Sequence, residues 1–277
     1  MVNTVRLTDE EFKLISSLVY ERSGIKLGEK KRALIIGRLQ KVLYSGGFTC
    51  FKEYYNHVVQ DPSGRALLTL IDQISTNHTY FFREKEHFNF LSTAALPQIT
   101  ETLRKKQRRD IRIWCAGCSS GEEPYTLAMV VSEYFGDNIL TVDTGILATD
   151  ISVSALEKAA AGVYPAEKMS EVPLAYRQKY FLSLKDGSWA VKQNLKEMVL
   201  FRRLNLNRQE YPFKGLFQVI FCRNVMIYFD RATQKALVER FHRYTEPGGY
   251  LFIGHSETLD RSSGLYRYIQ PSVYQKI

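Results

Sequence analysis

Residues 111–129 read IRIWCAGCSSGEEPYTLAM, and this stretch decides the fold. Its first part, IRIWCA, is an apolar run with the length and composition of a buried strand. Small residues at 117–121 follow and predict a tight turn, after which apolar residues recur at helical spacing. Ser120 with Glu123 three residues later is typical of a capping box, and Pro124 suits the first turn of a helix. The stretch therefore predicts a strand, a turn and a helix.

The start of this predicted helix is suited to an anionic group, because free backbone N–H groups at a helix N-terminus attract carboxylates and phosphates. Such turns are also plain connections in many α/β proteins, so the turn alone leaves both readings open. The next buried strand, 145–149, ends at Asp150. An acidic residue there holds ribose hydroxyls in dinucleotide-binding folds, but it equally suits an N-cap of the next helix. Its distance from the turn exceeds the usual spacing of about 20 residues.

The chain before this stretch has a different pattern, with apolar stripes at helical spacing. Thr8 predicts the start of a helix that ends at Gly24, and three more helices are predicted at 29–44, from Thr49, and at 65–74. We therefore predict an all-helical domain over residues 1–75. Basic side chains lie on the outer faces of its second helix: Lys30, Lys31, Arg38 and Lys41.

The rest of the chain predicts a linker over residues 76–90 and an α/β domain over residues 91–277. Strands and helices alternate there, and the chain closes on an antiparallel pair. Three β-prone runs between about 181 and 206 predict a small antiparallel insert. The predicted elements after the insert are a buried strand at 217–222, a helix at 231–244, and strands at 250–253, 266–270 and 273–277.

Composition bounds the class of protein. The 277 residues are 45% hydrophobic and 24% charged, which is ordinary for a soluble globular protein, and no apolar run reaches the length of a membrane span. The start of the chain has no signal-peptide pattern, and four cysteines in so long a chain make no disulfide framework. We therefore expect a cytoplasmic, monomeric protein without membrane insertion. Cys115 and Cys118 lack a second pair of ligands, so we expect no metal.

The net charge of +9 predicts an acidic partner. The basic residues are spread along the chain, with no zinc-finger spacing, RNP motif or basic tail, and this argues against nucleic acid.

Four stretches resemble the chemotaxis receptor methyltransferases of the CheR type, in that family's order. They are TNHTYFFRE at 76–84, GEEPY at 121–125, FCRNVMIYFD at 221–230 and GHSE at 254–257. The resemblance covers nearly the whole chain. It implies a helical N-terminal domain followed by a class I, Rossmann-like methyltransferase domain. That domain is a seven-stranded, doubly wound α/β fold with an antiparallel last strand and a small antiparallel β-subdomain.

The resemblance also implies an activity. Proteins of this type transfer a methyl group from S-adenosylmethionine to glutamate carboxylates on the cytoplasmic helices of bacterial chemoreceptors, leaving S-adenosylhomocysteine. It implies receptor binding by the basic residues of the helical domain and methyl transfer at Arg83 and Tyr228. The implied cofactor contacts are Asn77, Thr79, Arg83, Glu123, Asp150, Asn205, Leu206, Arg223 and Asn224.

Two other functions stay open at this point. A non-catalytic module that binds the cofactor or the receptor would keep the same binding residues. A nucleic-acid methyltransferase would share the fold and the positive charge. Amino-group methylation of a base usually shows a [DN]-P-P-[FYW] motif after the fourth strand, whereas this chain has RNVM at 223–226.

The insert bears on how the receptor is bound. Some members of the family dock a peptide from the receptor's C-terminus on this subdomain by adding a strand to its edge. Here the turn KDGS at 185–188 is short, and Trp189 follows it. We expect methylation without such a tether. The alternative is a peptide pocket at Trp189.

Overall fold

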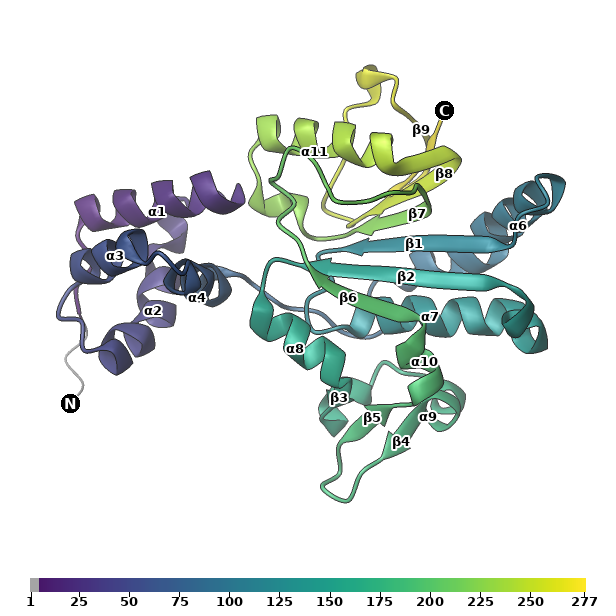
Figure 1. Ribbon diagram of the computed structural model, residues 1–277, viewed down its shortest axis with the longest axis horizontal. Helices are drawn as coiled ribbons and strands as arrows, with labels where there is room; N and C mark the ends of the chain where they lie inside the picture. Colours follow the sequence, from purple (N-terminus) through teal and green to yellow (C-terminus); the bar gives the residue numbers. More distant parts are fainter. Residues whose placement is uncertain (1–4) are drawn as a thin grey trace.

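The computed structural model describes residues 5–277, so the first four residues of the predicted helical domain lie outside it. A helical part stands beside an α/β part, joined by the chain that follows α4 (Figure 1). The helical part consists of α1 (Asp9–Ser23), the 3-10 turn Glu29–Lys31, α2 (Arg32–Gly46), α3 (Phe51–Gln60) and α4 (Arg65–Ile74).

Local signals place these helices close to where the sequence predicts them, although α2 begins at Arg32, after the 3-10 turn, and not at residue 29. Thr8 and Glu11 form a reciprocal capping box at the start of α1, and Gly24 ends the helix with φ 76°. Ile15, Ile35 and Leu39 are fully buried among the helices. The helical part therefore has a hydrophobic core of its own.

The α/β part is built on a seven-stranded sheet with the order β6-β2-β1-β7-β8-β10-β9. β10 runs antiparallel to both of its neighbours, whereas β6, β2, β1, β7 and β8 are parallel. The strands are β1 (Asp110–Ala116), β2 (Asp143–Asp150), β6 (Val199–Arg203), β7 (Phe217–Cys222), β8 (Thr245–Ile253), β9 (Tyr266–Gln270) and β10 (Val273–Lys276). The predicted seven-stranded sheet with an antiparallel last strand is confirmed.

Side chains of β1 alternate between the two faces of the sheet. Ile111, Ile113 and Cys115 belong to one buried cluster, and Trp114 and Ala116 belong to the other. Helices cover both faces, so the predicted doubly wound arrangement is confirmed (Figure 1). The covering helices are α5 (Lys85–Phe90), the π-helical turn Leu91–Ala95, α6 (Leu96–Lys105), α7 (Glu122–Phe135), α8 (Val153–Ala161) and α11 (Arg231–Tyr244). A 3-10 turn, Gly136–Thr141, joins α7 to β2.

A small antiparallel sheet projects from the α/β part, with the order β3-β5-β4. Its strands are β3 (Val163–Tyr164), β4 (Phe181–Ser183) and β5 (Trp189–Val191), and the 3-10 turn Ala166–Met169 and α9 (Leu174–Tyr180) lie between β3 and β4. The assignment of the run 198–206 to this insert is wrong. The short helix α10 (Gln193–Glu197) turns the chain back, and β6 then pairs with β2 at the edge of the large sheet.

No helix in the part of the chain that the structure describes combines the length and the apolar character needed to cross a membrane.

Candidate active site

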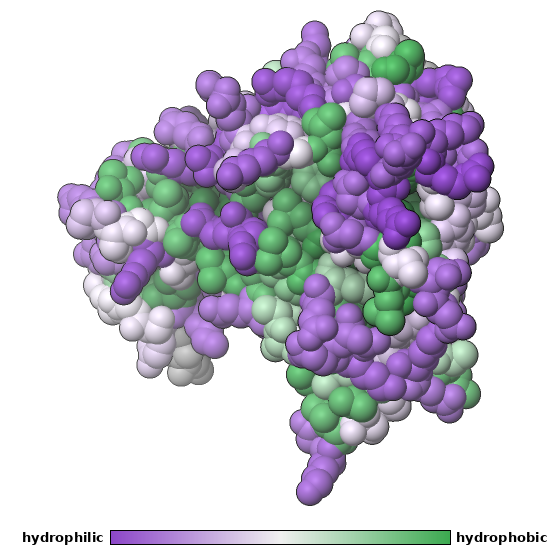
Figure 2. Space-filling view, turned by 45° about the vertical axis from the view of Figure 1, so that its right-hand side comes forward, coloured by the Kyte–Doolittle hydropathy of each residue, from purple (hydrophilic) through white to green (hydrophobic). Residues whose placement is uncertain are grey.

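A cavity with a volume of about 330 Å³ opens at the carboxyl ends of β1, β2 and β7, where the helical part meets the sheet. Gly117, Asp150 and Arg223 line it from the sheet, and Ser23 and Leu34 line it from the helical part. Figure 2 shows apolar residues gathered in a recess between the two parts. Ligands of open α/β sheets bind at this edge, because the loops after the strands meet there.

The turn after β1 is built differently from the predicted capping box. The N-cap of α7 is Gly121, with φ 96°, and no side chain caps it. A Cβ at this position would lie within 3.0 Å of Ala159, so only glycine fits. Ser120 instead donates a hydrogen bond to Glu122 at 2.7 Å. The capping-box prediction is wrong because the helix begins one residue later than the pattern implies. The side chain of Glu123 therefore takes no part in a cap.

Gly117 keeps the floor of the cavity close to the backbone. Its φ is 89°, and a Cβ there would lie 2.3 Å from a methyl group of Val225. The glycine therefore leaves a bare stretch of backbone beside the cavity, which a larger residue would fill.

Asp150 joins the loops after β1 and β2. Its carboxylate accepts hydrogen bonds from the N–H groups of Ser119 at 2.8 Å and Ser152 at 2.9 Å. Burial raises the pKa of Asp150, although these hydrogen bonds oppose the shift. The N-cap of α8 is Ser152, whose hydroxyl accepts from the N–H of Ala155. Asp150 is therefore not that cap, and it lines the cavity.

Arg223 is the centre of a buried ionic network. Its side chain is only 1% exposed, and its guanidinium contacts Glu123 at 2.8 Å and Glu84 at 3.0 Å. It also donates to the backbone carbonyl of Arg83. Burial alone would raise the pKa of Glu84, but the charge and hydrogen bonding of Arg223 lower it. The network fixes the linker, α7 and the end of β7 to one another.

Glu84 also lies beside two histidines. Ligand-type atoms of Glu84, His87 and His255 lie within 4.8 Å of one another. Burial, with the nearby charge of Arg223, lowers the pKa of His87 to about 3, so this imidazole is neutral at physiological pH. Because the Glu84 carboxylate already pairs with Arg223, we assign these residues to the ionic network. The sequence pattern included Glu84 in a motif but gave it no role.

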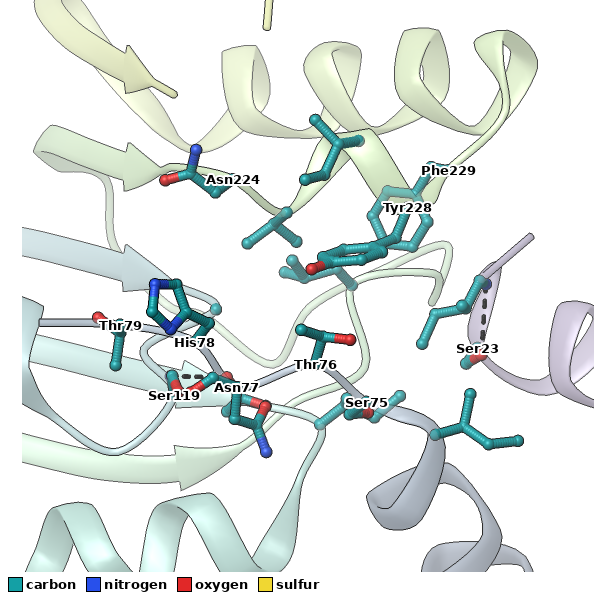
Figure 3. Close-up of a pocket in the computed structure, with 18 of the residues that line it drawn as sticks. Ser23, Ser75, Thr76, Asn77, His78, Thr79, Ser119, Asn224, Tyr228 and Phe229 are labelled. Carbon is teal, nitrogen blue, oxygen red and sulfur yellow. Dashed lines mark hydrogen bonds between the residues drawn. The ribbon is translucent and has the colours of Figure 1, made fainter. Parts of the chain in front are cut away.

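The linker forms one wall of the cavity, as Figure 3 shows for residues 76–79. Asn77 donates to the hydroxyl of Ser152 at 3.2 Å, and its carbonyl accepts from Ser119 at 3.0 Å. Arg83 donates to the carbonyl of His78 at 3.0 Å. The contacts of Asn77 tie the linker to the loops that follow β1 and β2.

Tyr228 lies where the helical part contacts the site. Its carbonyl accepts a hydrogen bond from the N–H of Lys26 at 2.8 Å, and the Lys31 ammonium lies 4.9 Å from the centre of its ring. Its hydroxyl points into the cavity (Figure 3). Asn205 makes a second link, because its amide donates to the carbonyl of Arg22 at 2.6 Å. The helical part therefore helps to shape the cavity.

The four basic residues that the sequence assigned to the second helix lie in the 3-10 turn Glu29–Lys31 and in α2, and their surroundings differ. Lys31 lines the cavity, and burial together with the charge of Arg38 lowers its pKa. Arg38 donates to the carbonyls of Ile74 and Ser75, each at 2.7 Å, and so caps α4. Lys30 and Lys41 are exposed. Arg38 is thus bound to backbone, which charge and helical spacing alone did not indicate.

Every residue predicted to bind the cofactor lines this one cavity, and so does Tyr228. The set is Asn77, Thr79, Arg83, Glu123, Asp150, Asn205, Leu206, Arg223 and Asn224. The individual roles of these residues remain predictions.

The donor set fits S-adenosylmethionine. A carboxylate at Asp150 suits ribose hydroxyls, Glu123 suits an ammonium group, and the bare backbone at Gly117 allows close approach. A doubly wound sheet with this strand order, and with this cavity and donor set at the carboxyl ends of its strands, is typical of methyltransferases of the Rossmann-like class.

Comparison with known protein families agrees with this class of enzyme. Residues 77–274 match the family described as "CheR methyltransferase, SAM binding domain", and residues 10–75 match "CheR methyltransferase, all-alpha domain". The chain belongs to the CheR methyltransferase family. It is an S-adenosylmethionine-dependent methyltransferase of chemotaxis, which confirms the resemblance seen in the sequence.

The relatives are similar over nearly their whole length. A chemotaxis protein methyltransferase of Borreliella burgdorferi is 46% identical over 272 residues, which cover 98% of this chain and 96% of that protein. Chemotaxis protein methyltransferase 2 of Pseudomonas aeruginosa is 36% identical, with 96% and 93% covered. The chemotaxis protein methyltransferase of Escherichia coli is also 36% identical, with 93% and 87% covered.

Proposed function

We propose that this enzyme methylates glutamate side chains on the helical cytoplasmic part of chemoreceptors, acting as a monomer in the cytoplasm. The product is a glutamate methyl ester together with S-adenosylhomocysteine. The observation that carries the proposal is the position of Tyr228: its hydroxyl faces the cavity that holds the predicted cofactor residues, at the junction with the helical part. A side chain presented by a receptor helix reaches the cofactor at this junction.

The reaction needs few catalytic groups. A glutamate carboxylate is already ionised at neutral pH, and the sulfonium of S-adenosylmethionine supplies an activated methyl group, so no strong general base is required. In this transition state opposite charges meet and cancel. The enzyme therefore gains most by excluding water and by holding the reacting atoms in line. Arg83 and Tyr228 line the cavity and would hydrogen-bond the carboxylate.

The direct test is transfer of a tritiated methyl group to purified receptor cytoplasmic fragments, followed by mild base. A glutamate methyl ester releases tritiated methanol under these conditions, whereas N-methyl groups stay on the protein. Binding of S-adenosylhomocysteine without any transfer would instead support a non-catalytic module. Transfer to nucleic acid would contradict the proposed substrate.

The exposed lysines Lys30, in the 3-10 turn before α2, and Lys41, in α2, should steer the receptor. We expect Lys30→Glu with Lys41→Glu to lower kcat/KM several-fold at low ionic strength and less at high salt, because salt screens exposed charges beyond roughly 10 Å. Affinity for S-adenosylhomocysteine should not change. Lys106→Glu with Lys185→Glu changes the net charge equally, at exposed positions away from the cavity. Equal activity of the two double variants would show that the lysines do not steer the receptor.

The small sheet should not bind a receptor tether. β5 is its central strand, and the free edges belong to the two residues of β3 and the three residues of β4. The guanidinium of Arg177 lies over the ring of Trp189 on β5, at 5.6 Å from the centre of that ring. We expect no binding when the enzyme is titrated with C-terminal receptor peptides. Micromolar binding that Trp189→Ala abolishes would contradict this expectation.

A further inference from the structure

Glu257 lies in the turn after β8, and its carboxylate binds backbone N–H groups of two separate loops. One oxygen accepts from Asn224 at 3.0 Å and from Gly254 at 2.6 Å, and the other accepts from Ile227 at 3.2 Å. One side chain therefore satisfies donors at both ends of the segment 224–227. This segment follows β7, and it leads directly into Tyr228.

The segment 224–228 belongs to no strand. Besides Glu257, it is held by Gln234, which donates to the carbonyl of Met226, and by the N–H of Lys26, which donates to the carbonyl of Tyr228. Asn224 has φ 58°, a left-handed conformation that costs a non-glycine residue energy. Beyond it the chain makes only the single 3-10 turn Met226–Tyr228. Backbone N–H groups outside a sheet need other acceptors, and for Asn224 and Ile227 the carboxylate of Glu257 is that acceptor.

The loop after β8 is shaped to bring Glu257 there. Gly254 packs so closely on Asn224 that a Cβ at Gly254 would lie 2.6 Å from the Asn224 side chain. Burial raises the pKa of Glu257, while the hydrogen bonds from Gly254, Asn224 and Ile227 oppose the shift. Such hydrogen bonds to a carboxylate are stronger than those to a neutral acceptor.

Glu257 itself does not line the cavity, whereas Asn224, Ile227 and Tyr228 do. Its effect on a bound ligand must therefore pass through the segment that it holds. Asn224 lies on the predicted cofactor side, and Tyr228 lies on the predicted substrate side.

We propose that Glu257 is a positioning residue for methyl transfer, whose carboxylate holds the segment 224–228 so that Asn224 and Tyr228 face the cofactor and the substrate together. The substrate half of this inference rests on the proposed function. Glu257→Gln keeps the size of the side chain, but it replaces one accepting oxygen with an NH₂ group that faces backbone donors.

The expected result for Glu257→Gln is a fall in kcat of roughly tenfold to a hundredfold, with receptor KM within about twofold, since charge-assisted hydrogen bonds to the segment are lost. Affinity for S-adenosylhomocysteine should fall several-fold. Amide hydrogen exchange should speed up at Asn224, Ile227 and Gly254 but not in β1 or α7. Glu239→Gln, an exposed change on α11, should match the wild type in every assay.

Three outcomes would overturn the inference. They are unchanged exchange at the three amides, unchanged kcat, or faster exchange spread over the whole sheet, which would indicate general unfolding. Cofactor affinity and hydrogen exchange do not depend on the receptor. If the wild-type enzyme methylates no receptor fragment, these two measurements still decide whether Glu257 holds the segment.

Discussion

Arg223→Met should destabilise the enzyme strongly and abolish measurable binding of S-adenosylhomocysteine. The side chain of Arg223 is 1% exposed, and its removal leaves the carboxylates of Glu84 and Glu123 without their shared cation. Breaking a buried ion pair by deleting one partner costs about 3–5 kcal/mol. Because the same guanidinium also binds the Arg83 carbonyl, the linker wall of the cavity should loosen as well. Chemical denaturation and calorimetry measure the two effects.

A second variant separates charge from packing. Adding Glu84→Gln to Arg223→Met removes one of the orphaned carboxylates and should restore part of the lost stability. Arg208→Met, which changes an exposed arginine, provides the matched control. If the double variant is no more stable than Arg223→Met, the loss comes from packing, and the assignment of an ionic network is wrong.

Asp150→Ala should weaken binding of S-adenosylhomocysteine without unfolding the α/β part. The lost carboxylate would remove one or two charge-assisted hydrogen bonds to ribose hydroxyls, each worth about 1.5–3 kcal/mol. It would also release the N–H groups of Ser119 and Ser152, which face the same carboxylate. We therefore expect affinity to fall at least tenfold by calorimetry.

The control for this change is Asp186→Ala in the exposed turn between β4 and β5. It removes the same charge far from the cavity and should leave affinity unchanged. Unchanged affinity in Asp150→Ala, with the fold intact, would show that this carboxylate does not bind the cofactor.

Local signals in the sequence determined most of the secondary structure. The cap at Thr8, the glycine after α1, and the apolar periods of α4 and α11 act between residues a few positions apart, so the chain itself displays them. The motifs likewise singled out residues that the structure brings together at one cavity. The sequence supplied this information because each motif is a continuous segment that follows its own strand or lies in the linker.

Only the tertiary structure decided which segments meet. β6 is a β-prone run like the strands of the insert, and its pairing with β2 depends on where α10 directs the chain. Ser120 and Glu123 fit a capping box, but the close packing of Gly121 on Ala159 sets a different helix start. Arg38 caps α4 from 36 residues away, and the carboxylate of Glu257 reaches backbone 33 residues away. Burial and long-range pairing are properties of the packed chain, so no local pattern contains them.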